Sequence, residues 1–355
     1  MSIRVFIVDD SAVVRKVLSE ILEDAAGIEV IGSAQDPLFA LPKMEKDWPD
    51  VILLDVEMPR MDGITFLKKI MAEKPTPVVM CSTLTEEGSR TSLQALSIGA
   101  IDVVAKPKAN LKTALPEASH DLVSAIRTAA KANVTVSKLK PIPAITKVPA
   151  KLTADAMLSR TTSRNAKRTG PLIAIGASTG GTQALEAVLK ALPANTLPII
   201  IVQHMPEKFT HTFANRLNDL CRVEVKEAED NDALLPGRVL IAPGGKHMML
   251  QKTQFGASVQ VKDGPLVSRH KPSVDVLFRS VAKYAAGNAL GIIMTGMGDD
   301  GAKGIKEMHD VGAKTIAQNE ATCVVYGMPQ EAVKLRAIDY EIALGKIPEM
   351  IVAHK

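Results

Sequence analysis

Two sets of side chains along this chain could do chemistry, and the first is a set of carboxylates. Asp9 and Asp10 directly follow one apolar run, and Asp55 directly follows another. If both runs are neighbouring strands of a parallel sheet, the three carboxylates meet at one edge of it. Their mutual repulsion is relieved when a hard divalent cation such as Mg²⁺ lies among them. A carboxylate beside bound Mg²⁺ can also act as a nucleophile towards a phosphoryl group, which gives an aspartyl phosphate.

Two further residues could contact such a phosphoryl group. Lys106 follows the last apolar run of this region and could place a positive charge beside the phosphoryl oxygens. Ser82 follows the fourth run and could offer a hydroxyl. A single acid at a strand end is more often a solvated residue or a helix N-cap, so this interpretation depends on the combination.

The second set starts at Ser178, which lies in a glycine-rich turn. An apolar run leads into Gly-Ala-Ser-Thr-Gly-Gly over residues 176–181, and a helical pattern follows. This order matches Gly-x-Ser-x-Gly, the nucleophile elbow of serine hydrolases, in which small neighbours leave the hydroxyl exposed. The N-terminus of the next helix would favour a negatively charged oxyanion. The turn alone fits a phosphate-binding loop equally well.

A histidine and an aspartate at other strand ends could complete a catalytic triad with Ser178. His204 follows the next apolar run, 26 residues after the serine, and is a candidate general base there. Asp299 and Asp300 follow a third run and open another helix, where a buried carboxylate could hold the imidazole tautomer. A Ca²⁺ loop or a helix cap is the alternative, although the EF-hand spacing is absent. The spacing alone leaves both acids open.

The elements that must position the first set are predicted from an alternation of β-branched runs and helical patterns over residues 1–120. This alternation is typical of βαβ units and a parallel sheet. The predicted strands are Ile3–Val8, Glu29–Ser33, Val51–Leu54, Pro77–Cys81 and Val103–Ala105. We therefore expect a (βα)5 fold of the flavodoxin-like type.

A second alternating block starts at Pro171 and must position the second set. Its predicted strands are Leu172–Gly176, Pro198–Gln203, Glu224–Ala228, Val239–Ala242, Leu290–Thr295 and Lys314–Ala317. We expect a doubly wound, Rossmann-like α/β domain with an inserted β-hairpin formed by His247–Gln251 and Ser258–Lys262. His247 and His270 flank this hairpin and could line a cleft.

The stretch between the two blocks is basic and lacks periodicity. Residues 131–170 hold nine Lys or Arg residues and one acid, Asp155, together with three prolines. The net charge of the whole chain is +4, but it becomes −4 without this stretch, so the sequence predicts no nucleic-acid surface on the folded parts. We expect a first domain over residues 1–125, a basic flexible linker over 126–170 and a second domain over 171–355.

Composition limits the class of protein further. Hydrophobic residues make up 46% of the chain and aromatic residues 3%, which favours aliphatic cores of buried parallel sheets. The three cysteines form no Cys-x-x-Cys and predict neither a disulfide framework nor a zinc site. No apolar run approaches the ~18 residues that a membrane span needs. We expect a soluble, cytoplasmic protein.

Over residues 1–125 the chain resembles the response-regulator receiver domain. An acid pair, a single acid, a hydroxyl and a Lys-Pro pair at the ends of successive strands carry this resemblance. It implies a phosphorylatable domain that uses Mg²⁺. The implied roles are phosphoacceptor for Asp55, metal binding for Asp9, Asp10, Asp55 and the backbone of Glu57, and phosphoryl contact for Ser82 and Lys106.

From Leu172 to its end the chain resembles the catalytic domain of the chemotaxis protein-glutamate methylesterases, the CheB family. The segments that carry the resemblance are Ile-Gly-Ala-Ser-Thr-Gly-Gly, Gln-His-Met-Pro and Met-Thr-Gly-Met-Gly-Asp-Asp-Gly. The chain order Ser, His, Asp differs from that of α/β-hydrolases. The resemblance implies that Asp300, directly before Gly301, is the triad acid, and that backbone N–H groups of Thr179 and Met297 bind the oxyanion.

The same resemblance implies an activity and its partners. The protein would demethylate glutamate γ-methyl esters of methyl-accepting chemoreceptors, release methanol, and deamidate receptor glutamines. A chemotaxis histidine kinase would donate the phosphoryl group, and the hydrolase chemistry would need no cofactor. The unphosphorylated receiver would inhibit the hydrolase, and phosphorylation would relieve this inhibition.

Two other functions of the second domain are less consistent with the sequence. A DNA-binding output expects a helix-turn-helix with a basic recognition helix, whereas the second block shows alternating strands and no basic excess. A dinucleotide-binding output expects Gly-x-Gly-x-x-Gly and a ribose-binding acid, and neither is found at residues 176–181.

Overall fold

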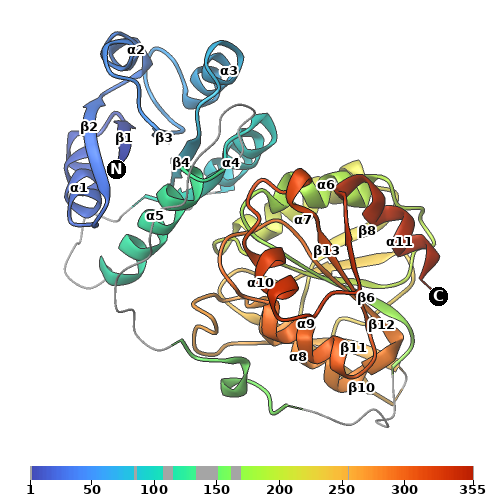
Figure 1. The fold of residues 1–355 in the computed structure, drawn as a ribbon. Helices are drawn as coiled ribbons and strands as arrows, with labels where there is room; N and C mark the ends of the chain where they lie inside the picture. Colours follow the sequence, from blue (N-terminus) through green and yellow to red (C-terminus); the bar gives the residue numbers. More distant parts are fainter. Residues whose placement is uncertain are drawn as a thin grey trace. The chain divides into compact units, whose positions relative to one another are not determined.

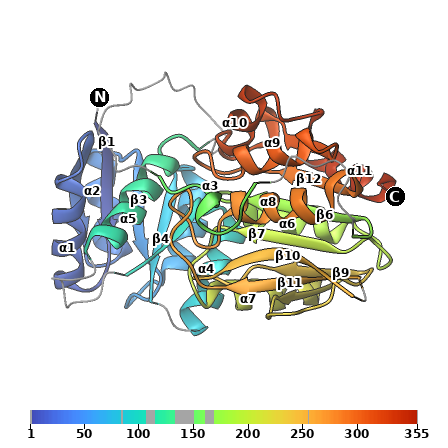
Figure 2. The same cartoon turned by 90° about the horizontal axis from the view of Figure 1, so that it is seen from below.

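The computed structural model describes residues 2–83, 86–106, 115–132, 151–160, 169–254 and 256–354. These residues fall into two units, Met1–Lys140 and Pro141–Lys355 (Figures 1 and 2). Each unit is described by itself.

The first unit is built around a parallel sheet of five strands in the order β2-β1-β3-β4-β5. The strands are β1 (Ile3–Val8), β2 (Ile28–Ala34), β3 (Val51–Asp55), β4 (Val78–Ser82) and β5 (Asp102–Ala105). The helices are α1 (Ala12–Glu23), α2 (Pro37–Lys46), α3 (Gly63–Glu73), α4 (Glu86–Ile98) and α5 (Leu115–Ala129). Helices α1 and α5 pack together, as do α3 and α4. The predicted (βα)5 fold is confirmed.

The two central strands of this sheet account for the unbroken apolar runs in the sequence. Every residue of β3 and β4 is buried, as expected for strands that are covered on both faces. Strand β1 pairs with β3, and Val8 lies opposite Leu54, so Asp9 and Asp55 come to the same edge. A Cβ at Gly63 would lie 2.1 Å from the carbonyl oxygen of Asp55. Only glycine therefore lets the start of α3 close over the end of β3.

The second unit is built around a parallel sheet of seven strands in the order β14-β13-β12-β6-β7-β9-β8. The strands are β6 (Leu172–Ala177), β7 (Ile199–Gln203), β8 (Glu224–Glu227), β9 (Arg238–Ile241), β12 (Ala289–Ile293), β13 (Lys314–Gln318) and β14 (Tyr340–Ile342). The helices are α6 (Gly181–Lys190), α7 (Phe209–Leu220), α8 (Val274–Tyr284), α9 (Ala302–Asp310), α10 (Met328–Lys334) and α11 (Ile347–Ala353). Short 3₁₀ helices are η1 (Ala154–Ala156), η2 (Ala286–Asn288), η3 (Glu320–Thr322) and η4 (Leu344–Lys346). The predicted doubly wound domain is confirmed.

The strand order reverses direction beside β6. From β6 the chain continues to β7 on one side, and it later returns through β12 on the other side, where Ile293 lies opposite Gly176. In open parallel sheets, ligands bind at the C-terminal strand ends where the order reverses. The loops that follow β6, β7 and β12 all open at this place, and they carry Ser178, His204 and Asp300.

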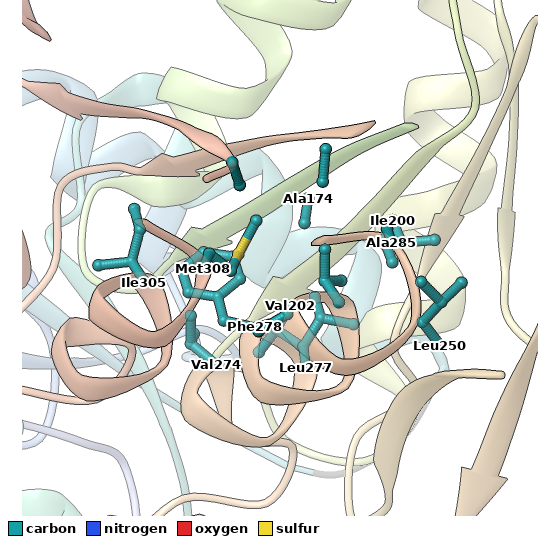
Figure 3. Packing of buried hydrophobic residues seen from close by; sticks show 14 of the residues in the cluster. Ala174, Ile200, Val202, Leu250, Val274, Leu277, Phe278, Ala285, Ile305 and Met308 are labelled. Carbon is teal, nitrogen blue, oxygen red and sulfur yellow. The ribbon is translucent and has the colours of Figure 1, made fainter. Parts of the chain in front are cut away.

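Helix α8 lies in the hydrophobic core of this unit and packs against the sheet and α9 (Figure 3). Its residues Val274, Leu277 and Phe278 are fully buried. A Cβ at Gly176 would lie 2.2 Å from a methyl group of Val274, so glycine lets the start of α8 approach the end of β6. The first backbone N–H groups of α8 are thereby placed beside the loops that carry the second set of residues.

The predicted hairpin is confirmed as β10 (His247–Thr253) and β11 (Gly256–Lys262), which pair antiparallel in a separate two-stranded sheet. It packs on α8, where the N–H of Leu250 donates to the hydroxyl of Ser280 at 2.7 Å.

Two described segments of the predicted linker, residues 126–170, contain regular structure. Helix α5 continues to Ala129. Residues 151–160, which include η1, belong to the second unit and pack against it. Residues 133–150 and 161–168 lie outside the described part of the chain.

Candidate functional site

The structure brings the three acids of the first unit together. Asp9, Asp10 and Asp55 offer carboxylate oxygens that lie within 4.8 Å of one another. The residues Asp9 and Asp55 are each 1% exposed, whereas Asp10 is exposed. The N–H of Ser11 donates to Asp9 at 2.8 Å, and the N–H of Glu57 donates to Asp55 at 3.3 Å.

Lys106 is the cation of this cluster. Its Nζ lies 2.6 Å from Oδ2 of Asp55 and 3.1 Å from Oδ2 of Asp9. Burial raises the pKa of Asp55 to about 6, and the neighbouring Lys106 ammonium offsets only part of that effect. Burial acts to lower the pKa of Lys106, but its contacts with Asp55 and Asp9 raise it overall, so the ammonium stays charged.

Ser82 and Glu57 border the cluster. Ser82 is the last residue of β4, is 1% exposed, and accepts a hydrogen bond at its carbonyl from the N–H of Lys106 at 2.8 Å. The side chain of Glu57 is exposed, and its backbone follows Asp55 by two positions.

These residues fit a divalent metal ion. The donors are carboxylate oxygens, which hard divalent cations prefer. Oδ2 of Asp9 and Oδ2 of Asp55 are buried, and both contact the ammonium of Lys106. Buried carboxylates are costly unless cations lie beside them. Lys106 supplies a single positive charge for two buried carboxylates, so a divalent cation would balance the remaining negative charge.

The raised pKa of Asp55 makes a prediction about stability. Because its folded pKa of about 6 exceeds its ordinary value of 3.8, Asp55 favours the folded state most below pH 4. That contribution is lost as the pH rises through about 6. The quantity to measure is the difference in unfolding free energy between the wild type and Asp55→Asn, both in EDTA. We expect this difference, wild type minus variant, to fall by roughly 1–3 kcal/mol as the pH rises from about 4.5 to 7.

Tryptophan fluorescence during urea unfolding measures this in the full chain, because Trp48, in the first unit, is the only tryptophan. If the difference in unfolding free energy between the wild type and Asp55→Asn stays constant or grows across this pH range, burial does not raise the pKa of Asp55.

In the second unit, Ser178 lies in a tight turn between β6 and α6. Its N–H donates to the carbonyl of Thr295 at 3.0 Å, and its carbonyl accepts from Gln203 Nε2 at 2.9 Å. Gly180 has a φ of 75° and caps α6. A Cβ at Gly296 would lie 2.7 Å from Cβ of Ser178, so glycine lets the loop after β12 approach the serine. The backbone of the turn is thus fixed on both sides, and the residue remains partly exposed.

His204 and Asp300 form a hydrogen-bonded pair. Nε2 of His204 lies 2.8 Å from Oδ2 of Asp300, and the side chains are 8% and 0% exposed. Asp300 also accepts from the hydroxyl of Ser273 at 2.8 Å and from the N–H groups of Val274 at 2.7 Å and Asp275 at 3.0 Å. Burial acts to raise the pKa of Asp300, but the bond to His204 lowers it below its ordinary value. An ionised carboxylate at the N-terminus of α8 is further favoured by the helix dipole.

Asp299 lies elsewhere. Its side chain is 40% exposed and forms an ion pair with Lys151. The structure therefore pairs His204 with Asp300 rather than with its neighbour in sequence.

The second ring nitrogen of His204 faces a different environment. Nδ1 is buried and has no hydrogen-bond partner among the described residues. Ala177 and Gln203 lie opposite each other in β6 and β7, so Ser178 and His204 follow directly from paired positions. Since Nε2 is engaged by Asp300, Nδ1 is the nitrogen left for a proton from a neighbouring hydroxyl.

A second histidine lies directly on His204. The rings of His204 and His270 stack with centroids 3.7 Å apart and planes 5° apart. Nδ1 of His270 donates to the carbonyl of Ser268 at 2.9 Å, and burial lowers the pKa of His270 to about 3, so the ring is neutral. The nitrogen lone pairs of parallel rings lie in parallel planes and do not converge on one ion, so this pair with Asp300 does not make a metal site.

His247 has a different place from the one the sequence suggested. It is fully buried, Nε2 donates to the carbonyl of Pro265 at 2.9 Å, and Nδ1 accepts from the N–H of Ser273 at 3.3 Å. It supports the loop before α8 and does not line a cleft.

The residues expected around the oxyanion flank the serine. Thr179 follows Ser178 and is 6% exposed, and its carbonyl accepts from the hydroxyl of Thr295 at 2.9 Å. Met297 follows Gly296, which lies against Ser178.

In the described part of the chain, no helix combines the length and the apolar character that crossing a membrane requires.

Comparisons with known proteins match each part of the chain to a known family. Residues 173–351 match the family model of the CheB methylesterase, and residues 5–115 match that of the response regulator receiver domain. A relative from Shewanella oneidensis, named protein-glutamate methylesterase/protein-glutamine glutaminase 3, is 60% identical over 99% of both chains. One from Pseudomonas savastanoi, numbered 1 under the same name, is 58% identical over 99% of this chain and 98% of its own. The catalytic domain of the Thermotoga maritima CheB methylesterase is 36% identical over 52% of this chain and 98% of its own, with a TM-score of 0.50.

Proposed function

We propose that this chain, which belongs to the CheB methylesterase family, is a phosphorylation-activated hydrolase of chemotaxis adaptation. It demethylates glutamate γ-methyl esters of methyl-accepting chemoreceptors and deamidates receptor glutamines to glutamate. The single observation that carries the proposal is the buried pair of His204 and Asp300, which lies beside the turn of Ser178 where the strand order reverses.

The hydrolase reaction uses the two nitrogens of His204 in different roles. Asp300 accepts a hydrogen bond from the protonated Nε2, so the neutral ring carries its lone pair on Nδ1. Ser178 Oγ attacks the ester carbonyl while Nδ1 takes the hydroxyl proton. The same proton passes to the methoxy oxygen, and methanol leaves. Water then attacks the acyl-serine, again with Nδ1 as the base, and releases glutamate and free Ser178.

The oxyanion and the alternative leaving group follow from the same arrangement. We assign the binding of the oxyanion to the backbone N–H groups of Thr179 and Met297. When the substrate is a glutamine, the proton from Nδ1 goes to the amide nitrogen, and ammonia leaves in place of methanol.

Peptide mass spectrometry of a methylated receptor incubated with the full chain tests the substrate. Expected products are glutamate at positions that held glutamyl methyl ester and at selected positions that held glutamine. A receptor whose methyl esters and glutamines all survive would refute the proposal.

In the receiver domain, Asp55 is the proposed phosphoacceptor, and a chemotaxis histidine kinase is the proposed donor. Asp9, Asp10, Asp55 and the backbone of Glu57 would hold Mg²⁺, which, when bound, neutralises charge on the phosphoryl oxygens. Ser82 and Lys106 contact the phosphoryl group, and Lys106 already lies 2.6 Å from Asp55.

The two domains divide the work as proposed from the sequence, with the receiver over 1–125 and the hydrolase over 171–355. Residues 126–170 connect the two domains, and the protein acts in the cytoplasm at membrane receptors. Phosphorylation relieves inhibition by the receiver, for which one phosphoryl group can supply a few kcal/mol.

Asp55→Asn tests this regulation. With Mg²⁺ and a small phosphodonor, we expect the methanol release rate of the wild type to rise severalfold, whereas the rate of Asp55→Asn stays the same with and without the phosphodonor, because the amide cannot be phosphorylated. Asp24→Asn, at an exposed helix end of the same domain, is the matched control and keeps the response. An Asp55→Asn protein that the phosphodonor still stimulates would contradict the assignment of the phosphoacceptor.

A further inference from the structure

Residues 151–160, called the strap here, lie between the two domains in sequence but are packed on the hydrolase unit. Ala154 is 3% exposed and lies in a small apolar cluster with Met249, Val267 and Val276. Ala156, two positions later in η1, is exposed. The strap therefore has an inner and an outer face.

A buried arginine fastens the inner face. The side chain of Arg279 in α8 is 2% exposed, and its Nη1 donates to Oδ1 of Asp155 at 2.7 Å and to the carbonyl of Leu158 at 3.0 Å. Its Nε and Nη2 donate to Glu307 at 2.8 and 2.7 Å. A buried guanidinium needs all its partners, because an unsatisfied buried charge is strongly destabilising. Two of these four bonds come from the strap.

The strap also holds a strained turn. The carbonyl of Leu152 accepts from the N–H of Ser268 at 2.9 Å. Ser268 and Arg269 have φ values of 50° and 70°, and backbone bonds of 3.1 and 2.9 Å between Val267 and His270 close the turn around them. Two successive non-glycine residues in the left-handed region are unfavourable and persist only where neighbours hold them. The hydroxyl of Ser268 also donates to Oδ2 of Asp275 at 3.0 Å.

This turn fixes His270. The carbonyl of Ser268 accepts from Nδ1 of His270, and the ring of His270 covers the ring of His204. Stacked rings restrict rotation of the imidazole. A continuous series of contacts thus leads from the strap through the turn and His270 to His204.

We propose that the strap is a positioning element of the hydrolase. It holds the turn Val267–His270, and His270 keeps the ring of His204 in the orientation in which Nε2 meets Asp300 and Nδ1 meets Ser178. The inference rests on the proposed role of His204 as the general base. It follows that a hydrolase fragment that begins at residue 171 lacks part of its own catalytic support.

Ala154→Arg in the full chain tests the strap, with Ala156→Arg as the matched control on the outer face. At saturating phosphodonor and Mg²⁺, we expect Ala154→Arg to lower kcat for methanol release at least about tenfold, because small displacements of a catalytic group have large effects. Ala156→Arg should stay within about twofold of the wild type.

Histidine ring signals in NMR provide the second readout. In Ala154→Arg, the signals of His204 and His270 should shift, whereas that of the exposed His211 should not. Wild-type kcat in Ala154→Arg, or a lowered kcat with unmoved His204 and His270 signals, would overturn the proposal.

A second pair of variants decides the matter if Ala154→Arg does not fold. Asp155→Ala removes a partner of Arg279 and should lower kcat, whereas Asp155→Asn keeps an acceptor oxygen and should recover most of the rate. If these two variants and the wild type had equal kcat values, the proposal that the strap positions His204 would be overturned. Ser178→Ala serves as the third arm, since activity in that variant would reject the proposed function itself, whatever the strap variants do.

Discussion

The Ser178→Ala protein is expected to release methanol from methylated receptor at a rate at least about 10³-fold below that of the wild type. The reason is chemical, because alanine has no oxygen to form the acyl-enzyme. The turn should survive the change, since the hydrogen bonds that fix it involve the backbone N–H and carbonyl of Ser178. Gas chromatography of released methanol measures the rate.

The control for this variant lies in the other domain. Labelling of Asp55 by a phosphodonor should match the wild type, which shows that the loss is confined to the hydrolase. Methanol release by a correctly folded Ser178→Ala protein at more than a few per cent of the wild-type rate would reject Ser178 as the nucleophile.

Asp300→Asn is expected to have the second largest effect, with kcat lowered about 10³–10⁴-fold. A carboxylate accepts a hydrogen bond from the protonated Nε2 and stabilises the imidazolium. An amide can instead donate to Nε2 and so place the ring proton on Nδ1, where Ser178 needs a base. The amide nitrogen that replaces Oδ2 also opposes the N–H of Val274, so some loss of stability should accompany the change. Thermal unfolding and kcat are measured on the same preparation.

Asp299→Asn is the matched control for Asp300→Asn. Its partner Lys151 is 33% exposed and the ion pair is at the surface, so the change should cost little in stability. We expect kcat within about threefold of the wild type. If Asp299→Asn lost more activity than Asp300→Asn, the triad acid would be Asp299.

Much of the fold could be predicted because strands of parallel sheets leave strong apolar runs. Strands β3 and β6 consist only of buried residues, and both were predicted within two residues of their ends. Strand β14 was missed because its three residues are exposed or half-buried at the sheet edge. Helix α11 was missed because its seven residues begin with Ile-Pro and leave little periodicity.

Those site residues could be predicted whose place is decided by the end of a strand. Ser178 and His204 each follow a strand, so topology alone brings them together. The choice between Asp299 and Asp300 depends on which side chain turns inward, and spacing does not contain that information. The stacking of His270 depends on a turn held from outside by the strap. The strap was hidden because it lies in a basic stretch rich in polar residues that resembles a linker, and its contacts come from isolated residues such as Ala154 and Asp155 and from backbone carbonyls.

The most direct test of the whole account is the rate of methanol release from methylated receptor by the purified full-length protein, with and without a small phosphodonor and Mg²⁺. The account predicts release in both conditions and a severalfold higher rate with the phosphodonor. Absence of methanol in both conditions would contradict the hydrolase, and release that the phosphodonor leaves unchanged would contradict its control by the receiver.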